Sequence, residues 1–218
     1  MTLHGGYGVG KTHLLQGVCN AMLTGPRHCR WTYLSAEDFA NQYVVALKTR
    51  KLEAFRNRFR NMDLLVIDDI HFLANKKAMQ EEFLHTFNSI DLAGKQVVLA
   101  SDAHPKEITQ LCEKLVNRFV SGMVVRMDAP DFEMRCRICA RRAESMKLNL
   151  TQEVIEYVAG SISANVRELE GALYKLVAFA SLTKGPITLD LARTALEDHI
   201  VRSTRSTGPN EIVSLVAN

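Results

Sequence analysis

Five short apolar runs alternate with longer helical patterns over the first 130 residues, and this alternation constrains the fold more than any other feature. The runs predicted as strands are Thr2–His4, Trp31–Ser35, Leu64–Asp68, Val97–Ser101 and Met123–Met127. Two of them, LLVID and VVLAS, are continuously apolar, as expected for strands that are buried on both sides. The alternation predicts βαβ units and therefore a five-stranded parallel sheet with helices on both faces.

The pattern changes after Pro130, where no further strand is convincing. Four helical segments are predicted instead, at 131–147, 151–162, 164–183 and 188–200. In the third segment apolar residues recur at the spacing of one helix face, and Thr188 is a suitable N-cap for the fourth. We therefore predict an α/β domain over residues 1–130, a small helical domain over 131–200 and a linker beyond them.

The composition is typical of a folded protein in a reducing compartment. Of 218 residues, 47% are hydrophobic, which is enough for a substantial core. No apolar run is long enough for a membrane-spanning helix, and no signal peptide precedes Gly5. The five cysteines are odd in number and scattered, and Cys136 and Cys139 lie within one predicted helix without further metal ligands nearby. We therefore expect a cytoplasmic protein with free thiols.

The segment GGYGVGKT (5–12) matches the phosphate-loop pattern G-x-x-x-x-G-K-[ST], between a short strand and a helical stretch. Glycines let backbone amides converge on phosphate oxygens, and the following helix adds its positive end. Lys11 is expected to reach the β- and γ-phosphates, and the Thr12 hydroxyl to bind Mg²⁺. A glycine-rich turn without a ligand is the alternative interpretation. The candidate nucleotide-binding residues are Gly6, Gly8, Val9, Gly10, Lys11, Thr12 and His13.

Two acids close the third apolar run, in LLVIDDIHFL. In a phosphate-loop protein the acid at this strand end holds Mg²⁺, so Asp68 and Thr12 are predicted as the metal site. Asp69 is predicted to orient the attacking water. Without a nucleotide nearby, the same two acids would form an ordinary turn. The phosphate loop occurs in kinases, GTPases and motor ATPases alike, so other segments of the chain are needed to distinguish these classes.

Three further segments narrow the choice: IDDIHFLANKKAMQEEFLHTFNSI (67–90), LASDAHPKEI (99–108) and NVRELEGAL (165–173). Together with GGYGVGKTHLLQGV they resemble the central AAA+ ATPase domain of DnaA, the bacterial replication initiator family, over about residues 3–200. The resemblance implies an AAA+ fold, in which a helical lid follows the five-stranded α/β domain. It also implies ATP and ADP as ligands, Mg²⁺ as cofactor, and slow hydrolysis that serves as a switch.

The resemblance places three residues around the γ-phosphate. Asp102 takes the sensor-1 position after the fourth strand, and Arg167 in NVRELEG takes the sensor-2 position. Arg118 takes the position of the arginine finger, which in this family reaches the ATP of the next subunit of a homo-oligomer. The alternatives are a surface arginine for Arg167 and a salt-bridged surface residue for Arg118. Lys114 stands where the family usually has an arginine.

The basic stretch at about 36–62 resembles the initiator-specific insertion, which builds filaments and helps to hold single-stranded DNA. Its predicted inner face consists of Leu52, Phe55, Phe59 and Met62. The basic residues left outside are Lys48, Arg50, Lys51, Arg56, Arg58 and Arg60. The implied single-strand contacts are Val44 and Lys76, whereas Ala78 replaces a basic residue common in the family. A solvated helix face is the alternative for such a charge run.

Other parts of the family are expected outside this chain. They are a segment that closes over the adenine, an N-terminal partner-binding domain, and a helix-turn-helix domain that reads duplex origin DNA and would begin within 201–218. Acidic phospholipids are a further implied partner. Two other functions stay open. One is a DnaA-like accessory ATPase, a regulator or helicase loader without the duplex-binding domain. The other is a phosphotransferase, which would need an acceptor pocket that the sequence does not signal.

Overall fold

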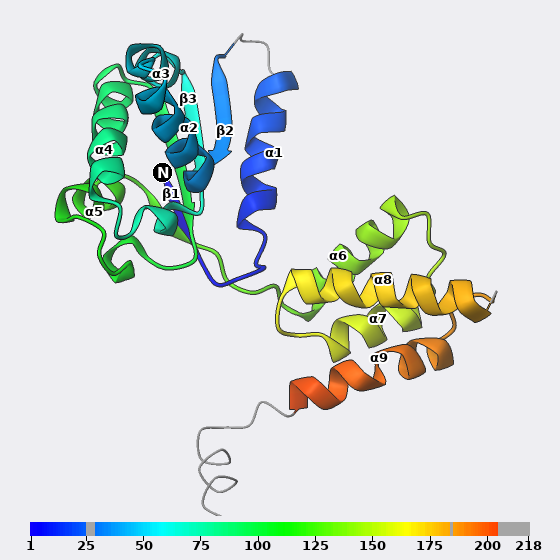
Figure 1. Cartoon of the computed structure of the whole chain (residues 1–218). Helices are drawn as coiled ribbons and strands as arrows, with labels where there is room; N and C mark the ends of the chain where they lie inside the picture. The colour runs from blue at the N-terminus through cyan, green and yellow to red at the C-terminus, as the bar shows by residue number, and fades with distance from the viewer. Residues whose placement is uncertain (25–28, 184, 205–218) are drawn as a thin grey trace, which may run out of the picture. The chain divides into compact units, whose positions relative to one another are not determined.

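The computed structural model describes residues 1–24, 29–183 and 185–204, with 198–204 described by their backbone alone (Figure 1). The predicted linker beyond residue 204 lies outside the described residues. The chain divides after Asp128 into two compact units, and each unit has a hydrophobic core of its own.

A parallel sheet forms the centre of the first unit. Its strands, among the described residues, are β1 (Thr2–His4), β2 (Trp31–Ser35), β3 (Leu64–Asp68), β4 (Gln96–Ser101) and β5 (Val124–Arg126). Their order is β2-β3-β4-β1-β5, and all pairings are parallel. The prediction of a five-stranded parallel sheet is confirmed. Because the strands are parallel, the segments after β1, β3 and β4 meet at one edge of the sheet.

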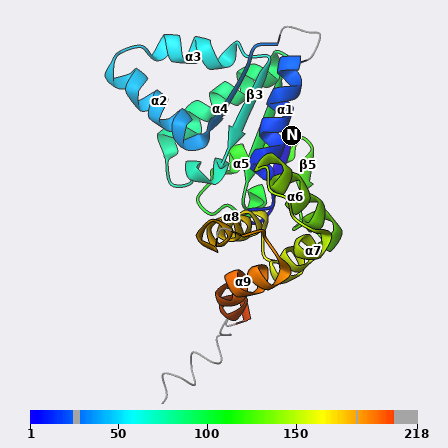
Figure 2. The ribbon, with the colours of Figure 1, turned by 90° about the vertical axis from the view of Figure 1, so that its right-hand side faces the viewer.

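Helices cover both faces of this sheet (Figure 1 and Figure 2). Leu64 and Val66 of β3 pack with α1 on one face, and Leu65 and Ile67 pack with the other helices on the opposite face. This alternation follows from the two-residue period of a strand. The helices are α1 (Lys11–Thr24), α2 (Ala36–Lys48), α3 (Leu52–Arg60), α4 (Lys77–Leu92) and α5 (Glu113–Val120), with the 3-10 turns η1 (Ile70–Leu73) and η2 (Pro105–Glu107).

Phenylalanine side chains anchor the predicted insertion, which forms α2 and α3. Phe39 of α2 lies at ring-centroid distances of 5.2 Å from Phe55, 5.1 Å from Phe59 and 5.3 Å from Phe83. Phe55 and Phe59 are buried, and Leu52 packs against the same core. Aromatic pairs at these separations stabilise by about 1 kcal/mol beyond the burial of their area. Of the predicted inner face, Leu52, Phe55 and Phe59 therefore hold the insertion on the rest of the unit, whereas Met62 lies beyond the end of α3.

Two of the basic residues expected outside α3 are instead engaged by α4. Glu82 is 3% exposed, and its carboxylate accepts hydrogen bonds from Arg56 at 2.8 Å and from Arg60 at 2.9 Å. A buried carboxylate needs such partners because an unpaired buried charge is costly. The prediction that Arg56 and Arg60 remain available on the surface is therefore wrong. Sequence spacing could not show it, because the acid lies on another helix.

The second unit consists of helices alone, among its described residues. They are α6 (Phe132–Ser145), α7 (Gln152–Ser161), α8 (Val166–Thr183) and α9 (Leu189–Thr204), and they enclose a core that includes Val158, Leu169, Leu173 and Leu176. The Thr188 side chain accepts a hydrogen bond from the Leu191 amide, as the predicted N-cap requires. Cys139 is buried in this core, and burial raises the pKa of its thiol to about 12.

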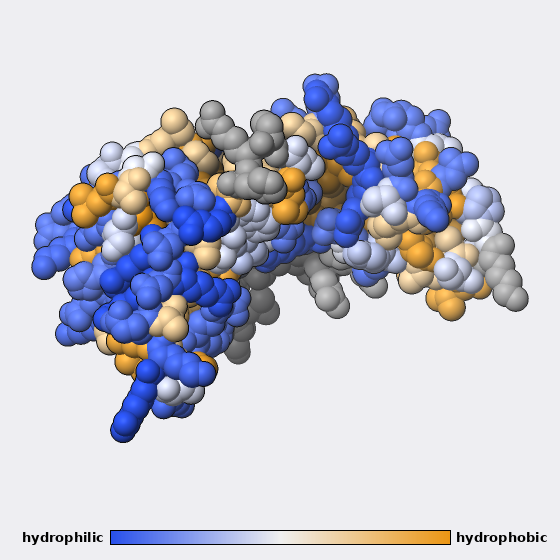
Figure 3. All heavy atoms as spheres, turned by 90° about the horizontal axis from the view of Figure 1, so that it is seen from above, coloured by the Kyte–Doolittle hydropathy of each residue, from blue (hydrophilic) through white to orange (hydrophobic). Residues whose placement is uncertain are grey.

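Hydrophilic residues dominate the face drawn in Figure 3, and hydrophobic residues form small separate groups on it. None of the helices that the structure describes is long and apolar enough to cross a membrane. Of the five cysteines, none is in a disulfide, as expected for free thiols.

Candidate functional site

The glycine-rich loop connects β1 to α1 in a geometry that requires glycine. A Cβ atom on Gly5 would lie 2.2 Å from the carbonyl oxygen of Met127, and Gly8 and Gly10 adopt positive φ angles of 69° and 101°. The first intrahelical bond of α1 runs from the amide of Leu14 to the carbonyl of Gly10 at 2.9 Å. The amides of residues 11–13 therefore precede the helical ladder, and these amides form a site for an anion.

Lys11 is 6% exposed and lies at the base of this loop. Its ammonium donates to the carbonyl oxygens of Gly5 and Gly6, both at 2.8 Å, and to Asp102 Oδ1 at 2.7 Å. Asp102 follows β4, which is the neighbour of β1 in the sheet. The structure thus brings together the loop lysine and the acid assigned to the sensor-1 position.

Three hydrogen bonds hold the carboxylate of Asp68, which is 3% exposed. Oδ2 accepts from the Thr12 hydroxyl at 2.7 Å and from the Tyr33 hydroxyl at 3.1 Å, and Oδ1 accepts from the Asp69 amide at 2.9 Å. Burial, followed by the charge of Asp68, raises the pKa of Tyr33 above its ordinary value. Tyr33 was not predicted from the sequence, because only the pairing of β2 with β3 places it beside Asp68.

Asp69 follows Asp68 in the chain, and its side chain lies near His71 and Asp102. Its backbone is left-handed, with φ at 55°, and its side chain is exposed. Partial burial, followed by the charge of Asp68, raises the pKa of the Asp69 carboxyl. One side-chain oxygen of Asp69, one imidazole nitrogen of His71 and one oxygen of Asp102 lie within 4.8 Å of one another. The loops after β3 and β4 therefore form one polar cluster, in which His71 was not predicted.

The donor set at this edge of the sheet fits a nucleotide with Mg²⁺. A hydroxyl and a carboxylate in direct contact, Thr12 and Asp68, offer the hard oxygen ligands that Mg²⁺ takes beside phosphate groups. The loop amides and the Lys11 ammonium supply the complementary positive charge.

The two predicted arginines lie in different units. Arg118 is exposed on α5, and among the described residues no acidic side chain is within ion-pair distance of its guanidinium. The alternative of a salt-bridged surface residue therefore has no support in the structure. Arg167 is exposed in the first turn of α8, in the helical unit.

The two predicted DNA contacts both lie on the surface of the first unit. Val44 on α2 is 42% exposed. Lys76 is exposed at the start of α4, and its ammonium lies 3.1 Å from the ring centroid of Phe72 and donates to the Phe72 carbonyl at 2.6 Å. Phe72 therefore fixes the position of this charge.

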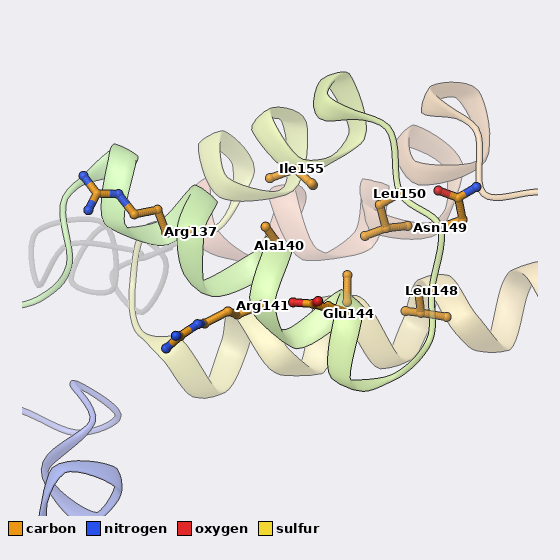
Figure 4. Close-up of a pocket in the computed structure, with 9 residues that line it drawn as sticks. Arg137, Ala140, Arg141, Glu144, Leu148, Asn149, Leu150 and Ile155 are labelled. Atoms are coloured by element: carbon orange, nitrogen blue, oxygen red, sulfur yellow. The ribbon is translucent and has the colours of Figure 1, made fainter. Parts of the chain in front are cut away.

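A separate hollow of about 570 Å³ lies within the helical unit, between α6, α7 and the connection between them (Figure 4). It is lined by apolar side chains that include Leu148, Leu150 and Ile155, and by the charged Arg137 and Arg141. None of the predicted site residues lines it.

The sheet order, the phosphate loop after β1 and the acids after β3 define a P-loop ATPase of the AAA+ class. The family model described as the bacterial DnaA ATPase domain matches residues 1–126. The chain belongs to this bacterial DnaA family. The predictions of the family, of the AAA+ fold and of an ATPase are thereby confirmed.

The similar proteins include the chromosomal replication initiator protein DnaA of Caldanaerobacter subterraneus subsp. tengcongensis. It is 46% identical over 203 residues, which are 93% of this chain and 46% of that protein. DnaA of Thermoanaerobacter sp. is 44% identical over the same length and with the same coverage of each chain. The chain thus spans about half the length of the curated relatives it matches.

Solved structures agree with this assignment. Domain III of the Thermotoga maritima replication initiation protein DnaA has a TM-score of 0.87 and 36% identity, over 92% of this chain and 84% of that one. A replication initiator DnaA bound to AMPPCP and single-stranded DNA has a TM-score of 0.73 and 39% identity, over 84% of this chain and 57% of that one. The Thermotoga maritima RuvB motor, at 17% identity and a TM-score of 0.63, shares the fold over 90% of this chain and 60% of that one.

Proposed function

We propose that this chain is the ATP-switched assembly module of a DnaA-type chromosomal replication initiator. The observation that supports this most directly is the convergence of Lys11, Thr12, Asp68 and Asp102 at one edge of the sheet. AMPPCP is bound in two similar DnaA structures, one of them from Aquifex aeolicus. ATP and ADP are therefore the proposed ligands, with Mg²⁺.

In this proposal the loop residues bind the phosphates. The amides from Gly8 to His13 donate to phosphate oxygens, and the Lys11 ammonium exchanges its carbonyl partners for the β- and γ-phosphates. Thr12 and Asp68 hold Mg²⁺, which when bound neutralises charge on the phosphates. Tyr33 keeps the Asp68 carboxylate in place.

Two acids act on the γ-phosphate side. Asp69 accepts a hydrogen bond from the attacking water and orients it, which its exposed position beside Asp68 permits. Asp102 senses the γ-phosphate through its ion pair with Lys11. When the Lys11 ammonium pairs with the γ-phosphate, its ion pair with the Asp102 carboxylate breaks. Hydrolysis is slow and resets the switch.

Arginines connect the nucleotide to its surroundings. Arg118, exposed and unpaired among the described residues, reaches the ATP of a neighbouring copy and makes assembly depend on ATP. Arg167 contacts the γ-phosphate from the helical unit. The assembled form binds single-stranded DNA through Val44 and Lys76, and a similar DnaA has been solved with single-stranded DNA.

The location and the further partners of the protein in the cell are also proposed. The protein acts in the cytoplasm, at the replication origin, and acidic phospholipids are a further partner. Recognition of duplex origin DNA belongs to a domain outside residues 1–218. The chain covers about half the length of its curated relatives, so these roles stand as proposals for it.

The test combines nucleotide binding with assembly. Mg-ATP and Mg-ADP are titrated into the 218-residue chain and into Lys11→Ala, and particle mass is then measured in each nucleotide with Arg118→Ala beside it. We expect binding that Lys11→Ala loses, and larger particles in ATP than in ADP that Arg118→Ala loses. Equal mass in both nucleotides would contradict the assembly switch, and unchanged binding by Lys11→Ala would contradict the site.

A further inference from the structure

A buried amide in α4 connects two loops that lie far apart in the sequence. Gln80 is 3% exposed. Its Nε2 donates to the carbonyl oxygens of Leu73 and Gln110, both at 2.9 Å, and its Oε1 accepts from the amide of Cys112 at 2.7 Å. All three partners are backbone groups, so both N–H donors of the amide and its oxygen bond to main chain.

Both loops are of the kind that needs such support. Gln110 and Asn75 adopt positive φ angles of 64° and 65°, a left-handed conformation that asparagine tolerates but glutamine rarely adopts. The Asn75 amide donates to the Gln110 carbonyl at 3.4 Å, so the two turns also contact each other directly. Gln80 bonds to the same Gln110 carbonyl and therefore lies at the junction of the two turns.

Each loop leads into a helix that carries a residue of the proposed function. Cys112 is the N-cap of α5, and no side chain caps that helix. The side-chain oxygen of Gln80 accepts from the backbone amide of Cys112 and therefore fixes where α5 begins. Arg118 lies further along α5. On the other side, the side-chain Nε2 of Gln80 donates to the carbonyl of Leu73, which ends η1 three residues before Lys76.

We propose that Gln80 is a positioning residue that fixes the start of α5 against the start of α4, and so sets Arg118 in register with Lys76. The inference rests on the proposed function, because Arg118 and Lys76 have their roles there. Its consequence is that DNA contact at Lys76 and assembly through Arg118 act on one rigid junction. Loss of the Gln80 side-chain amide would uncouple DNA contact at Lys76 from assembly through Arg118, while leaving the phosphate loop intact.

The test uses Gln80→Met, which keeps an unbranched side chain of similar length but removes all three hydrogen bonds. Ile90→Val is the matched control, because it removes a buried methyl group from the same helix without touching either loop. We expect Gln80→Met to bind Mg-ATP within about twofold of the parent chain, since distant sites act independently. The concentration for ATP-dependent assembly should rise about tenfold, a usual size for coupling between sites.

A second cycle separates positioning from general loss of stability. If Gln80 acts through Arg118, the double variant Gln80→Met, Arg118→Ala assembles no worse than Arg118→Ala alone. Additive losses would overturn the inference. If Arg118→Ala weakens assembly and Gln80→Met does not, the inference alone is wrong. If Arg118→Ala has no effect on assembly, the role proposed for Arg118 is wrong, and the inference that rests on it is wrong as well.

Hydrogen exchange gives a readout that does not need assembly. In Gln80→Met the Cys112 amide loses its acceptor, so exchange at residues 111–113 should become faster, whereas Ile90→Val should leave it unchanged. Unchanged exchange at Cys112 in Gln80→Met would mean that the amide does not fix the start of α5, and would overturn the proposal.

Discussion

At the scale of single residues, the Asp68 carboxylate depends on two hydroxyl groups that donate to the same oxygen. Tyr33→Phe removes one of them without changing the shape of the side chain. We expect the Mg²⁺ concentration for half-maximal ATP hydrolysis to rise about tenfold, as when a group that orients a metal ligand is lost. The free energy of unfolding should fall by about 1.5–3 kcal/mol, the usual value for a hydrogen bond to a charged group.

Tyr43→Phe is the matched control for this variant, because Tyr43 is also partly buried and packs against the core through its ring. Mg²⁺ titrations of hydrolysis and urea unfolding measure the two effects. A Tyr33→Phe protein with the parent Mg²⁺ dependence would show that Thr12 alone orients Asp68.

Asp69 provides a prediction with a defined pH dependence. Its pKa is raised in the folded chain, so the folded state binds the proton more tightly than the unfolded state does. The stability contribution of Asp69 therefore rises as pH falls through its folded pKa, and it is lowest at neutral pH. Asp69→Asn removes the repulsion with Asp68, and asparagine tolerates the left-handed backbone at φ 55°.

We therefore expect Asp69→Asn to hydrolyse no ATP, to bind it as before, and to be more stable than the parent chain at pH 7. The stability difference should vanish as pH falls through the range in which the Asp69 carboxyl protonates. Thermal unfolding from pH 7 to pH 4 measures it. A variant that is less stable than the parent at pH 7 would contradict the cause assigned to the raised pKa.

At the scale of elements, α3 and α4 are joined by the buried Glu82 and its two arginines. Glu82→Ala leaves Arg56 and Arg60 without this partner, and they are only 31% and 29% exposed. We expect the free energy of unfolding to fall by about 1–3 kcal/mol. Glu53→Ala, which removes an exposed acid 3.6 Å from Arg56, should change it by less than about 0.5 kcal/mol. Equal effects would show that burial of Glu82 does not decide its contribution.

The elements were largely predictable because their signals are local. Continuous apolar runs mark β3 and β4, and the phosphate-loop pattern marks the start of α1. The inner face of α3 followed from the spacing of Phe55 and Phe59. The state of its outer face could not be predicted, because a run of basic residues does not show which acids on other helices lie beside it. Local patterns therefore gave the elements, and packing decided which charges remain free.

At the scale of the whole molecule, the site depends on strand order. Lys11 and Asp102, which are 91 positions apart, were both predicted as site residues from the sequence. Their contact was not predicted. That contact exists because β4 inserts beside β1, and no local pattern encodes the order β2-β3-β4-β1-β5. Tyr33 and Gln80 were missed for the same reason: their partners belong to other elements, and neither residue type signals a role by itself.

Arg167 belongs to the helical unit, whereas the phosphate loop belongs to the first unit. If its guanidinium takes the γ-phosphate, Mg-ATP bound to the phosphate loop should slow hydrogen exchange in α8 as well as in α1. Mg-ADP should protect α1 alone. Arg167→Ala should keep the protection of α1 and lose that of α8, and ATP should bind about tenfold more weakly, as expected when a charge-assisted contact is removed.

The exposed Arg193 on α9 gives the matched control, since Arg193→Ala removes the same charge from another helix of the same unit. It should leave both protection patterns unchanged. Protection of α8 that persists in Arg167→Ala would show that the helical unit responds to ATP without this arginine. Protection of α1 alone in every protein would show that the helical unit takes no part in sensing the γ-phosphate, and the switch would then lie within residues 1–128.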